Sequence, residues 1–317
     1  MSSAMSSKNL SVFYPRVFVL EGLPGFEWAH VWISIPIFIM YLMALLGNSL
    51  LLFLIATVKQ LQSPMYYFLF TLFITDVTVS STIVLKMLPI FWMNLKEISF
   101  LSCLVQMFFV HYFSALESGI LLAMAYDRYV AICDPLHYTT TLTATLILKI
   151  IIVLLIRGVI LVAPCPVLAS RLPYCQTHHI AHCYCDHMAV VTLACTNITI
   201  NSVFGLTAVL LVTVIDVSLI AVSYFFILRS VLKLSSRAAK HKAFSTCTSH
   251  VCIFLTSYTL GLFSSVTYRI GNINPNIHIM MSVFYVLIPP AINPIIYGVK
   301  TKEIRSAVYN LISRSAK

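Results

Sequence analysis

The sequence predicts an all-α membrane protein: a seven-transmembrane helix bundle followed by a short amphipathic C-terminal helix. Three observations support this prediction. Hydrophobic residues make up 60 % of the chain and charged residues only 9 %, whereas soluble domains carry about 25 % charged residues. The apolar residues form seven stretches, each long enough to cross a bilayer as a helix of about 20 residues. The Lys and Arg residues lie mainly in the segments between these stretches.

The seven predicted spans contain very few ionisable residues. In chain order they are Val31–Val58, Met65–Leu85, Cys103–Tyr126, Ile150–Ser170, Ile198–Leu228, Phe244–Tyr268 and Ile277–Val299. Four of them are interrupted by one formally charged residue each: Asp76, Glu117, Arg157 and Asp216. Because an ionisable side chain is costly inside a bilayer, each of these four is a candidate for function.

Charge placement divides and orients the chain. We expect residues 1–28 to be an extracellular N-terminal segment, 29–299 the seven-transmembrane domain, and 300–317 a cytoplasmic amphipathic helix and tail. With the N-terminus outside, most of the Lys and Arg residues face the cytoplasm, as the positive-inside rule favours. Asn9 then lies outside as a glycosylation acceptor. These features predict a multi-pass plasma-membrane protein with a cytoplasmic C-terminus.

The C-terminal segment has a second, amphipathic pattern. Ile304, Val308 and Leu311 recur at helical spacing, in a segment that also carries the bases Lys300, Lys302 and Arg305. This pattern is typical of a helix that lies on the inner leaflet and contacts anionic membrane lipid.

Composition and motifs exclude several classes of protein. The net charge is +10, but the basic residues lie in short loops and form no basic, aromatic face for nucleic acid. The chain has no G-x-S-x-G, H-E-x-x-H or phosphate-loop motif, so we expect no enzymatic activity and no cofactor. A transporter or channel stays open as the alternative, with a cation path through Asp76 and Glu117, although no internal repeat supports it.

Five short motifs occur at the expected helix ends and in a consistent order. They are Gly47-Asn48, Pro64-Met65-Tyr66-Tyr67-Phe68-Leu69, Asp127-Arg128-Tyr129, the segment from Lys242 to His250, and Asn293-Pro294-Ile295-Ile296-Tyr297. Together they resemble the odorant-receptor family of rhodopsin-like G-protein-coupled receptors, over nearly the whole chain. The long loop through Cys183 and Cys185, Asp216, and Tyr268-Arg269-Ile270-Gly271 resemble its fish-like first class.

The resemblance implies a role in olfaction: the binding of a small organic odorant, the activation of a stimulatory, olfactory-type heterotrimeric G protein, and a rise in cyclic AMP. It assigns the G-protein switch to Asp127, Arg128, Tyr129, Asn293, Pro294 and Tyr297. Asp127 would hold Arg128 at rest and release it on activation. Such an exchange of partners gives two states separated by a few kcal/mol.

The resemblance also implies a ligand site. Arg269 and Ser265 are one helical turn apart on one face, and in first-class receptors these positions hold the acid group of carboxylic odorants. The remaining wall is expected from His111, His187, Met188, Val162, Cys165, Gly205 and Val209. The alternatives are that Arg269 snorkels to the membrane surface, that His111 is bonded within its helix, and that His187 is a loop contact. A ligand without an acid group also stays open.

The cysteines and the buried acids carry further expectations. By resemblance, Cys103 bonds Cys185 and Cys175 bonds Cys195, which leaves Cys183 free or exchanging with Cys185; we expect disulfides here and no structural metal site. Asp76 and Glu117 either share a sodium ion or a proton, or are satisfied separately by hydroxyl or amide groups.

Two features of the later helices leave questions open. Asp216 either has a functional role or makes a helix-packing contact. Helix six departs from the family, because Ser257-Tyr258 is followed by Thr259-Leu260 instead of a proline. We expect Ser257 to enlarge or polarise the floor of the pocket.

Overall fold

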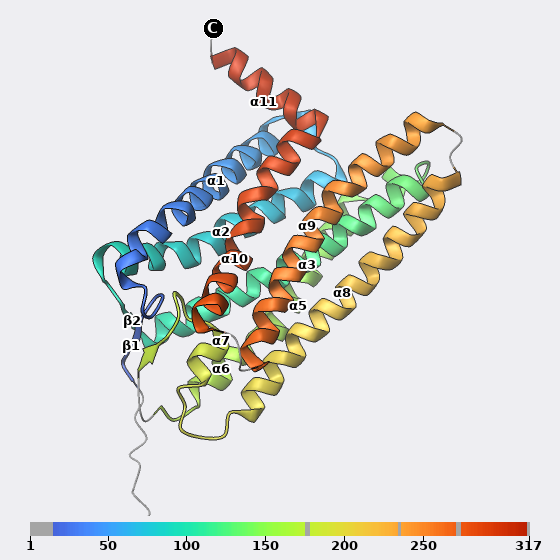
Figure 1. The fold of residues 1–317 in the computed structure, drawn as a ribbon. Helices are drawn as coiled ribbons and strands as arrows, with labels where there is room; N and C mark the ends of the chain where they lie inside the picture. The colour runs from blue at the N-terminus through green and yellow to red at the C-terminus, as the bar shows by residue number, and fades with distance from the viewer. Residues whose placement is uncertain (1–14, 175–177, 234–235, 271–273, 316–317) are drawn as a thin grey trace, which may run out of the picture.

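The computed structural model describes residues 15–174, 178–233, 236–270 and 274–315. Some side chains inside the described helices are not placed. These are residues 238–239, 242–246, 249–250, 265–270 and 314–315. The described chain is almost entirely helical, and its long helices pack side by side in one bundle (Figure 1).

Seven long helices cross the bundle, which confirms the predicted fold class. They are α1 (His30–Thr57), α2 (Pro64–Met93), α3 (Phe100–Cys133), α5 (Ala144–Val162) with its continuation α6 (Pro164–Ser170), α8 (Thr199–Lys233), α9 (Arg237–Ile270) and α10 (Pro275–Lys300). Six of these spans are long and apolar enough to cross a membrane over their described residues. The described side chains of α9 add a shorter apolar stretch, Val251–Ser264.

Local sequence explains where several helices begin. The Ser99 hydroxyl accepts a hydrogen bond from the Ser102 amide at the start of α3, and the Thr143 hydroxyl does the same for Leu146 at the start of α5. Each thereby satisfies a backbone donor that a helix leaves unpaired at its N-terminus. Pro64 occupies the first turn of α2, where a missing amide hydrogen has no consequence.

Small residues allow the helices to approach closely. A Cβ atom added to Gly47 of α1 would lie 2.7 Å from the ring of Pro294 in α10. A Cβ atom added to Gly119 of α3 would lie 2.6 Å from Leu154 of α5. Both contacts are typical of membrane helices, whose interfaces favour residues that bring backbones together.

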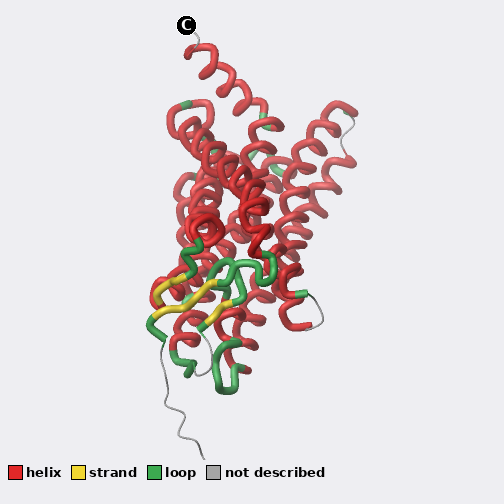
Figure 2. The backbone as a smooth tube through the Cα atoms, turned by 60° about the vertical axis from the view of Figure 1, so that its left-hand side comes forward, coloured by secondary structure: helices red, strands yellow, loops and turns green. Residues whose placement is uncertain are grey.

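We name the two ends of the bundle by residues of α3: the disulfide end, near Cys103, and the Arg128 end. A three-stranded sheet lies at the disulfide end (Figure 2). It contains β1 (Val17–Leu20), β2 (Glu97–Ser99) and β3 (His179–Ile180) in the order β2-β1-β3. The central strand β1 runs antiparallel to β2 and parallel to β3. The sequence analysis did not predict this sheet, because strands of two to four residues are too short to show an alternating pattern.

The sheet fastens residues 15–28 to the bundle. Phe18 and Leu20 of β1 are fully buried, and the ring of Phe18 meets Tyr174 edge-on at 5.5 Å. The Nδ1 atom of His179 lies 2.7 Å from a carboxylate oxygen of Glu21. The predicted N-terminal segment, residues 1–28, therefore ends in an ordered cap over the disulfide end.

Shorter helices complete the chain: 3-10 turns at Glu27–Ala29 and Lys59–Leu61, α4 (Tyr138–Thr141), α7 (His187–Val191) and α11 (Lys302–Ser315). Helix α11 leaves the bundle at the end opposite the sheet (Figure 1). Ile304 and Ala307 are buried, whereas Lys302, Tyr309 and Ile312 are exposed. The predicted amphipathic C-terminal helix is present.

Candidate functional site

A cavity of about 160 Å³ opens among α3, α5, α6, α8, α9 and α10 on the side of the disulfide end. It runs along α3 from Val110 to Ser118, a depth of about 12 Å at the helical rise of about 1.5 Å per residue. Its wall is mostly apolar, with a few hydroxyl groups and one carboxylate. Pockets for small organic ligands have this composition.

The cavity gathers most of the residues expected to form the ligand site. Seven of the nine line it: His111, Val162, Cys165, His187, Met188, Gly205 and Val209. The other two, Ser265 and Arg269, belong to α9, but their side chains lie outside the described part of the chain. Among the described lining residues there is no Lys or Arg.

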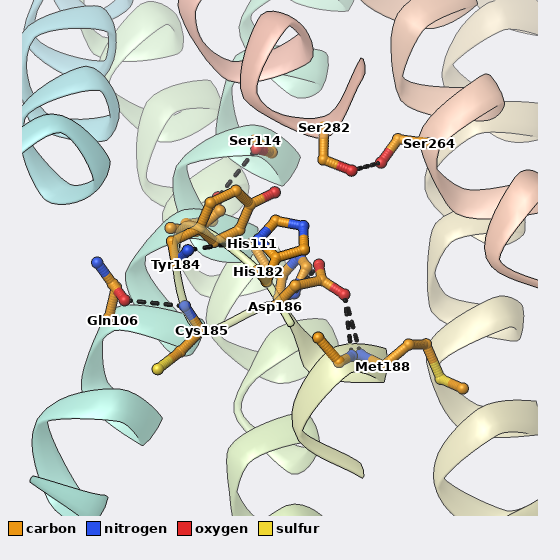
Figure 3. Close-up of polar contacts among 12 residues, drawn as sticks. Gln106, His111, Ser114, His182, Tyr184, Cys185, Asp186, Met188, Ser264 and Ser282 are labelled. Atoms are coloured by element: carbon orange, nitrogen blue, oxygen red, sulfur yellow. Dashed lines mark hydrogen bonds and ion pairs between the residues drawn. The ribbon is translucent and has the colours of Figure 1, made fainter. Parts of the chain in front are cut away.

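Asp186 forms one wall of the cavity near the disulfide end (Figure 3). One of its oxygens caps α7, accepting hydrogen bonds from the Met188 amide at 3.0 Å and the Ala189 amide at 3.5 Å. The other oxygen lies 3.8 Å from Nε2 of His111. The resemblance did not point to Asp186, although an acid directly before a helix is a recognisable cap signal.

Histidines surround the Asp186 carboxylate. Burial by itself raises the pKa of Asp186, but positive charge on the nearby imidazoles of His111, His182 and His187 lowers it, and the net pKa lies below the ordinary value. Asp186 is therefore ionised at neutral pH. The cavity has a fixed negative group at this end.

His182 is the most deeply enclosed of these histidines. It is fully buried, its ring meets Tyr184 edge-on at 4.3 Å, and its Nδ1 atom accepts a hydrogen bond from the Tyr184 amide. Burial lowers the pKa of His182 to about 4, although Asp186 acts in the opposite direction. The imidazole is thus neutral at physiological pH. Protonation of His182 in acid would place a charge in this buried part of the loop, which is unfavourable.

The inner end of the cavity, which we call the floor, consists of Ser118, Ser257 and Tyr258. Ser118 donates a hydrogen bond of 2.6 Å to Asp216, and its oxygen lies 2.8 Å from the Tyr258 hydroxyl. Ser257 donates a hydrogen bond of 3.2 Å to Glu117. Buried carboxylates on α3 and α8 therefore stand directly behind the floor.

The Asp216 carboxylate is fully buried and paired with Arg157 of α5. The two terminal nitrogens of the guanidinium, Nη1 and Nη2, donate to the two carboxylate oxygens at 2.7 and 2.8 Å. Of the two interpretations of Asp216, the structure therefore supports a packing contact between helices. The same carboxylate also lies directly behind the floor of the cavity, where it accepts a hydrogen bond from Ser118. Opposite lone charges in two apolar spans were the signal that could have identified this pair.

Asp76 and Glu117 have different polar partners. The Asn293 amide donates a hydrogen bond of 2.9 Å to one oxygen of Asp76, whereas Glu117 accepts from Ser257. The second oxygen of Asp76 and the side-chain oxygens of Asn48 and Asn293 are buried with no hydrogen-bond partner among the described residues. Carboxylate and amide oxygens are ligands that hard cations prefer, so these residues fit a cation.

The Arg128 end contains a second polar cluster. Arg128 is ion-paired with the adjacent Asp127, and its Nε atom donates to Asp127 at 2.8 Å. The hydroxyl of Tyr138 in α4 donates to the other oxygen of Asp127 at 2.8 Å. Of the other expected switch residues, Asn293, Pro294 and Tyr297 are buried in α10, and Tyr129 is partly buried. Sequence reasoning missed Tyr138, whose helix is only one turn long.

A disulfide joins Cys103 at the start of α3 to Cys185 in the loop before α7, which is the pairing that the resemblance implied. Cys195 is also in a disulfide, while its expected partner Cys175 lies outside the described residues, as does Asn9. Cys183 is buried and free. Because a disulfide already occupies Cys185, the structure favours the free state of Cys183 over exchange.

Comparison with known proteins gives a consistent family. The model of the olfactory receptor family matches residues 37–315. Human olfactory receptor 52K1 is 50 % identical over 98 % of this chain and 99 % of its own length. Human olfactory receptor 52D1 is 51 % identical over 97 % of this chain and 98 % of its own length. Human olfactory receptor 52K2 is 48 % identical over 98 % of this chain and 99 % of its own length.

Proposed function

The chain belongs to the olfactory receptor family of G-protein-coupled receptors, and on this premise we propose that it binds a small organic odorant in the cavity beside Asp186. Family membership makes it a multi-pass membrane protein that is not an enzyme, and it replaces the transporter or channel alternative. The observation that carries the proposed site is the cavity itself, because it collects His111, Cys165 and Met188 from three separate segments in one mostly apolar space.

A carboxylic acid is the ligand class proposed for Arg269. The guanidinium group is a planar fork of donors that matches a carboxylate, and Ser265 adds a hydroxyl one turn away. Among the described lining residues the charged group is Asp186, so an acid that enters the cavity needs a positive partner to offset this like charge. A neutral odorant needs no such partner.

We propose that the disulfide end faces outward and the Arg128 end faces the cytoplasm. An oxidising exterior favours the Cys103–Cys185 bond. The basic residues of α11 suit the inner leaflet. The partner at the Arg128 end is then a stimulatory, olfactory-type G protein, and the output is a rise in cyclic AMP.

The geometry suggests how the ends communicate. Tyr258 of α9 is hydrogen-bonded to Ser118 of α3, so a ligand that displaces Tyr258 changes how α9 packs against α3. Movement of α9 reaches the Arg128 end because the helix extends there without a break. Arg128 then leaves Asp127 and meets the G protein. Exchange of polar partners supplies the two states that such a switch requires.

We also propose a sodium ion or a proton at Asp76, shared with Glu117 across the bundle. The buried oxygens of Asp76, Asn48 and Asn293 would hold the ion and supply it with hard ligands. The measurement is thermal stability of the purified receptor in sodium against choline chloride. Sodium should stabilise the wild type and not Asp76→Asn, and equal effects on both would remove the proposal.

The proposed function as a whole, from odorant binding to the rise in cyclic AMP, is tested with a cell reporter for cyclic AMP. The reporter cells are exposed to a panel of acids, alcohols, ketones and esters. At least one compound should activate the receptor. Arg269→Ala should abolish the response to acids while preserving surface expression. Arg171→Ala changes an exposed arginine at the same end of the bundle and serves as the matched control. Equal activation of wild type and Arg269→Ala by acids would refute the assignment of Arg269.

A further inference from the structure

The floor hydroxyls can be assigned as donors or acceptors by following their protons. Asp216 is paired with Arg157 and is therefore an ionised carboxylate, which can only accept hydrogen bonds. Ser118 uses its single proton for the 2.6 Å bond to Asp216. The 2.8 Å contact between Ser118 and Tyr258 must then be a bond in which Tyr258 donates. The Tyr258 proton consequently points into the wall, and only its oxygen lone pairs are left for the cavity.

The hydroxyl proton of Ser257 also points away from the cavity, in this case toward the carboxyl group of Glu117. Its hydroxyl donates to Glu117 at 3.2 Å, and both side chains are almost fully buried. A serine hydroxyl has one proton and two lone pairs. When Glu117 is ionised, as in the sodium-bound form proposed above, it can only accept, so the Ser257 proton is directed at Glu117 and Ser257 offers only acceptor positions to the cavity.

Because of these two hydrogen-bond chains, the hydroxyl oxygens of the floor act only as hydrogen-bond acceptors toward the cavity. Tyr258 donates to Ser118, Ser118 to Asp216, and Ser257 to Glu117. Each proton runs away from the cavity toward a carboxyl group. A ligand atom that can only accept hydrogen bonds, such as a ketone oxygen, finds no donor there and loses its bond to water. A hydroxyl group can donate and keeps its hydrogen bond.

We propose that the floor formed by Ser257 and Tyr258 selects an aliphatic alcohol, whose hydroxyl donates its proton to one of these two oxygens at the inner end of the cavity. This inference rests on the proposed odorant site. It assigns the ligand group that binds at the floor, and it does not depend on an acid group at Arg269. The cavity volume of about 160 Å³ is close to that of an engineered apolar cavity that binds benzene. It suits an alcohol of about six carbon atoms.

The test compares 2-hexanol with 2-hexanone, which share a skeleton and differ in the presence of a donor. Binding is measured by thermal stabilisation of the purified receptor in nanodiscs, which does not require coupling to a G protein. We expect 2-hexanol to bind several-fold to about tenfold more tightly than 2-hexanone, the effect of one net hydrogen bond. Equal affinity for the two compounds, or no binding of the alcohol, overturns the inference.

Variants separate the floor from the rest of the wall. Ser257→Ala and Tyr258→Phe should each reduce the ratio of alcohol to ketone affinity, whereas Ser257→Thr should keep it. Thr213→Val is the matched control, because Thr213 lines the same cavity but takes no part in these hydrogen-bond chains. If Thr213→Val reduces the ratio and Ser257→Ala and Tyr258→Phe do not, the selecting group is elsewhere. Failure of the proposed function is distinguishable, since it appears as no cyclic AMP response to any compound in the panel.

Discussion

Arg157 of α5 and Asp216 of α8 form a two-point ion pair in the interior of the bundle, with nitrogen–oxygen distances of 2.7 and 2.8 Å. The Asp216 side chain is fully buried, and the Arg157 side chain is 25 % exposed. Each charge would be unfavourable alone in an apolar environment, and together they connect two helices that line the cavity. The same carboxylate receives the Ser118 hydroxyl, so the pair also fixes the floor.

Removal of one member of this pair should destabilise the receptor strongly. Arg157→Met leaves the Asp216 carboxylate buried without its counter-ion, and such changes cost about 3–5 kcal/mol. We expect a lower midpoint of thermal unfolding in detergent and reduced surface expression. The double variant Arg157→Met with Asp216→Leu should be more stable than either single variant. Arg171→Met, on an exposed arginine, is the control, and an additive loss in the double variant would argue against a coupled pair.

The disulfide end should depend on the bond between Cys103 and Cys185. The two cysteines are 82 residues apart in sequence, and loss of a native disulfide that closes a long loop typically costs about 2–5 kcal/mol. Cys103→Ser, Cys185→Ser and the double variant should lower surface expression to the same extent, because each removes the same bond. Cys252→Ser changes an exposed free cysteine and should have no effect. A double variant clearly worse than both singles would contradict this expectation.

The seven helices were predictable because each has enough consecutive apolar residues to span a bilayer, a property that sequence records directly. The sheet through Phe18 was not, because its three strands are brought together by pairing between distant segments. Similarly, Val162, Gly205 and Met188 were placed in the ligand site by resemblance to a family. Nothing in their own spacing brings three segments around one cavity.

Polar partners were the least predictable part of the site. Arg157 and Asp216 were both noted as lone charges, yet only the packing of α5 and of α8 against α3 decides that they meet. Tyr138 lies in a four-residue helix and carries no periodic signal. The departure at Ser257 was visible in sequence, and its consequence required the position of Glu117.

Acid should destabilise the loop between α6 and α8 through His182. Its pKa is lowered from 6.5 to about 4 by burial in the folded protein, so between these values the unfolded chain binds more protons than the folded one. Stability is complete above pH 6.5 and is lost as the pH falls toward 4. Asp186, whose pKa is also lowered, acts in the same direction.

The measurement is the thermal unfolding midpoint of the purified receptor between pH 7.5 and 4.5, values that bracket much of this window. His182→Gln keeps a side chain that can accept a hydrogen bond from the Tyr184 amide but cannot be protonated in this range, so its pH dependence should be smaller. His137→Gln, which alters an exposed histidine at the Arg128 end, is the control. Equal pH dependence in wild type and His182→Gln would exclude His182 as the group responsible.

Tyr138 should restrain the resting state at the Arg128 end. Its hydroxyl donates to the Asp127 oxygen that Arg128 does not use, and it therefore helps to fix the carboxylate that holds Arg128. A hydrogen bond to a charged group contributes about 1.5–3 kcal/mol. If only part of this favours the resting state, Tyr138→Phe should raise basal cyclic AMP signalling several-fold at equal surface expression. Tyr309→Phe, on an exposed position of α11, should leave it unchanged. Unchanged basal signalling in Tyr138→Phe would mean that the pairing of Asp127 with Arg128 holds the resting state without help from α4.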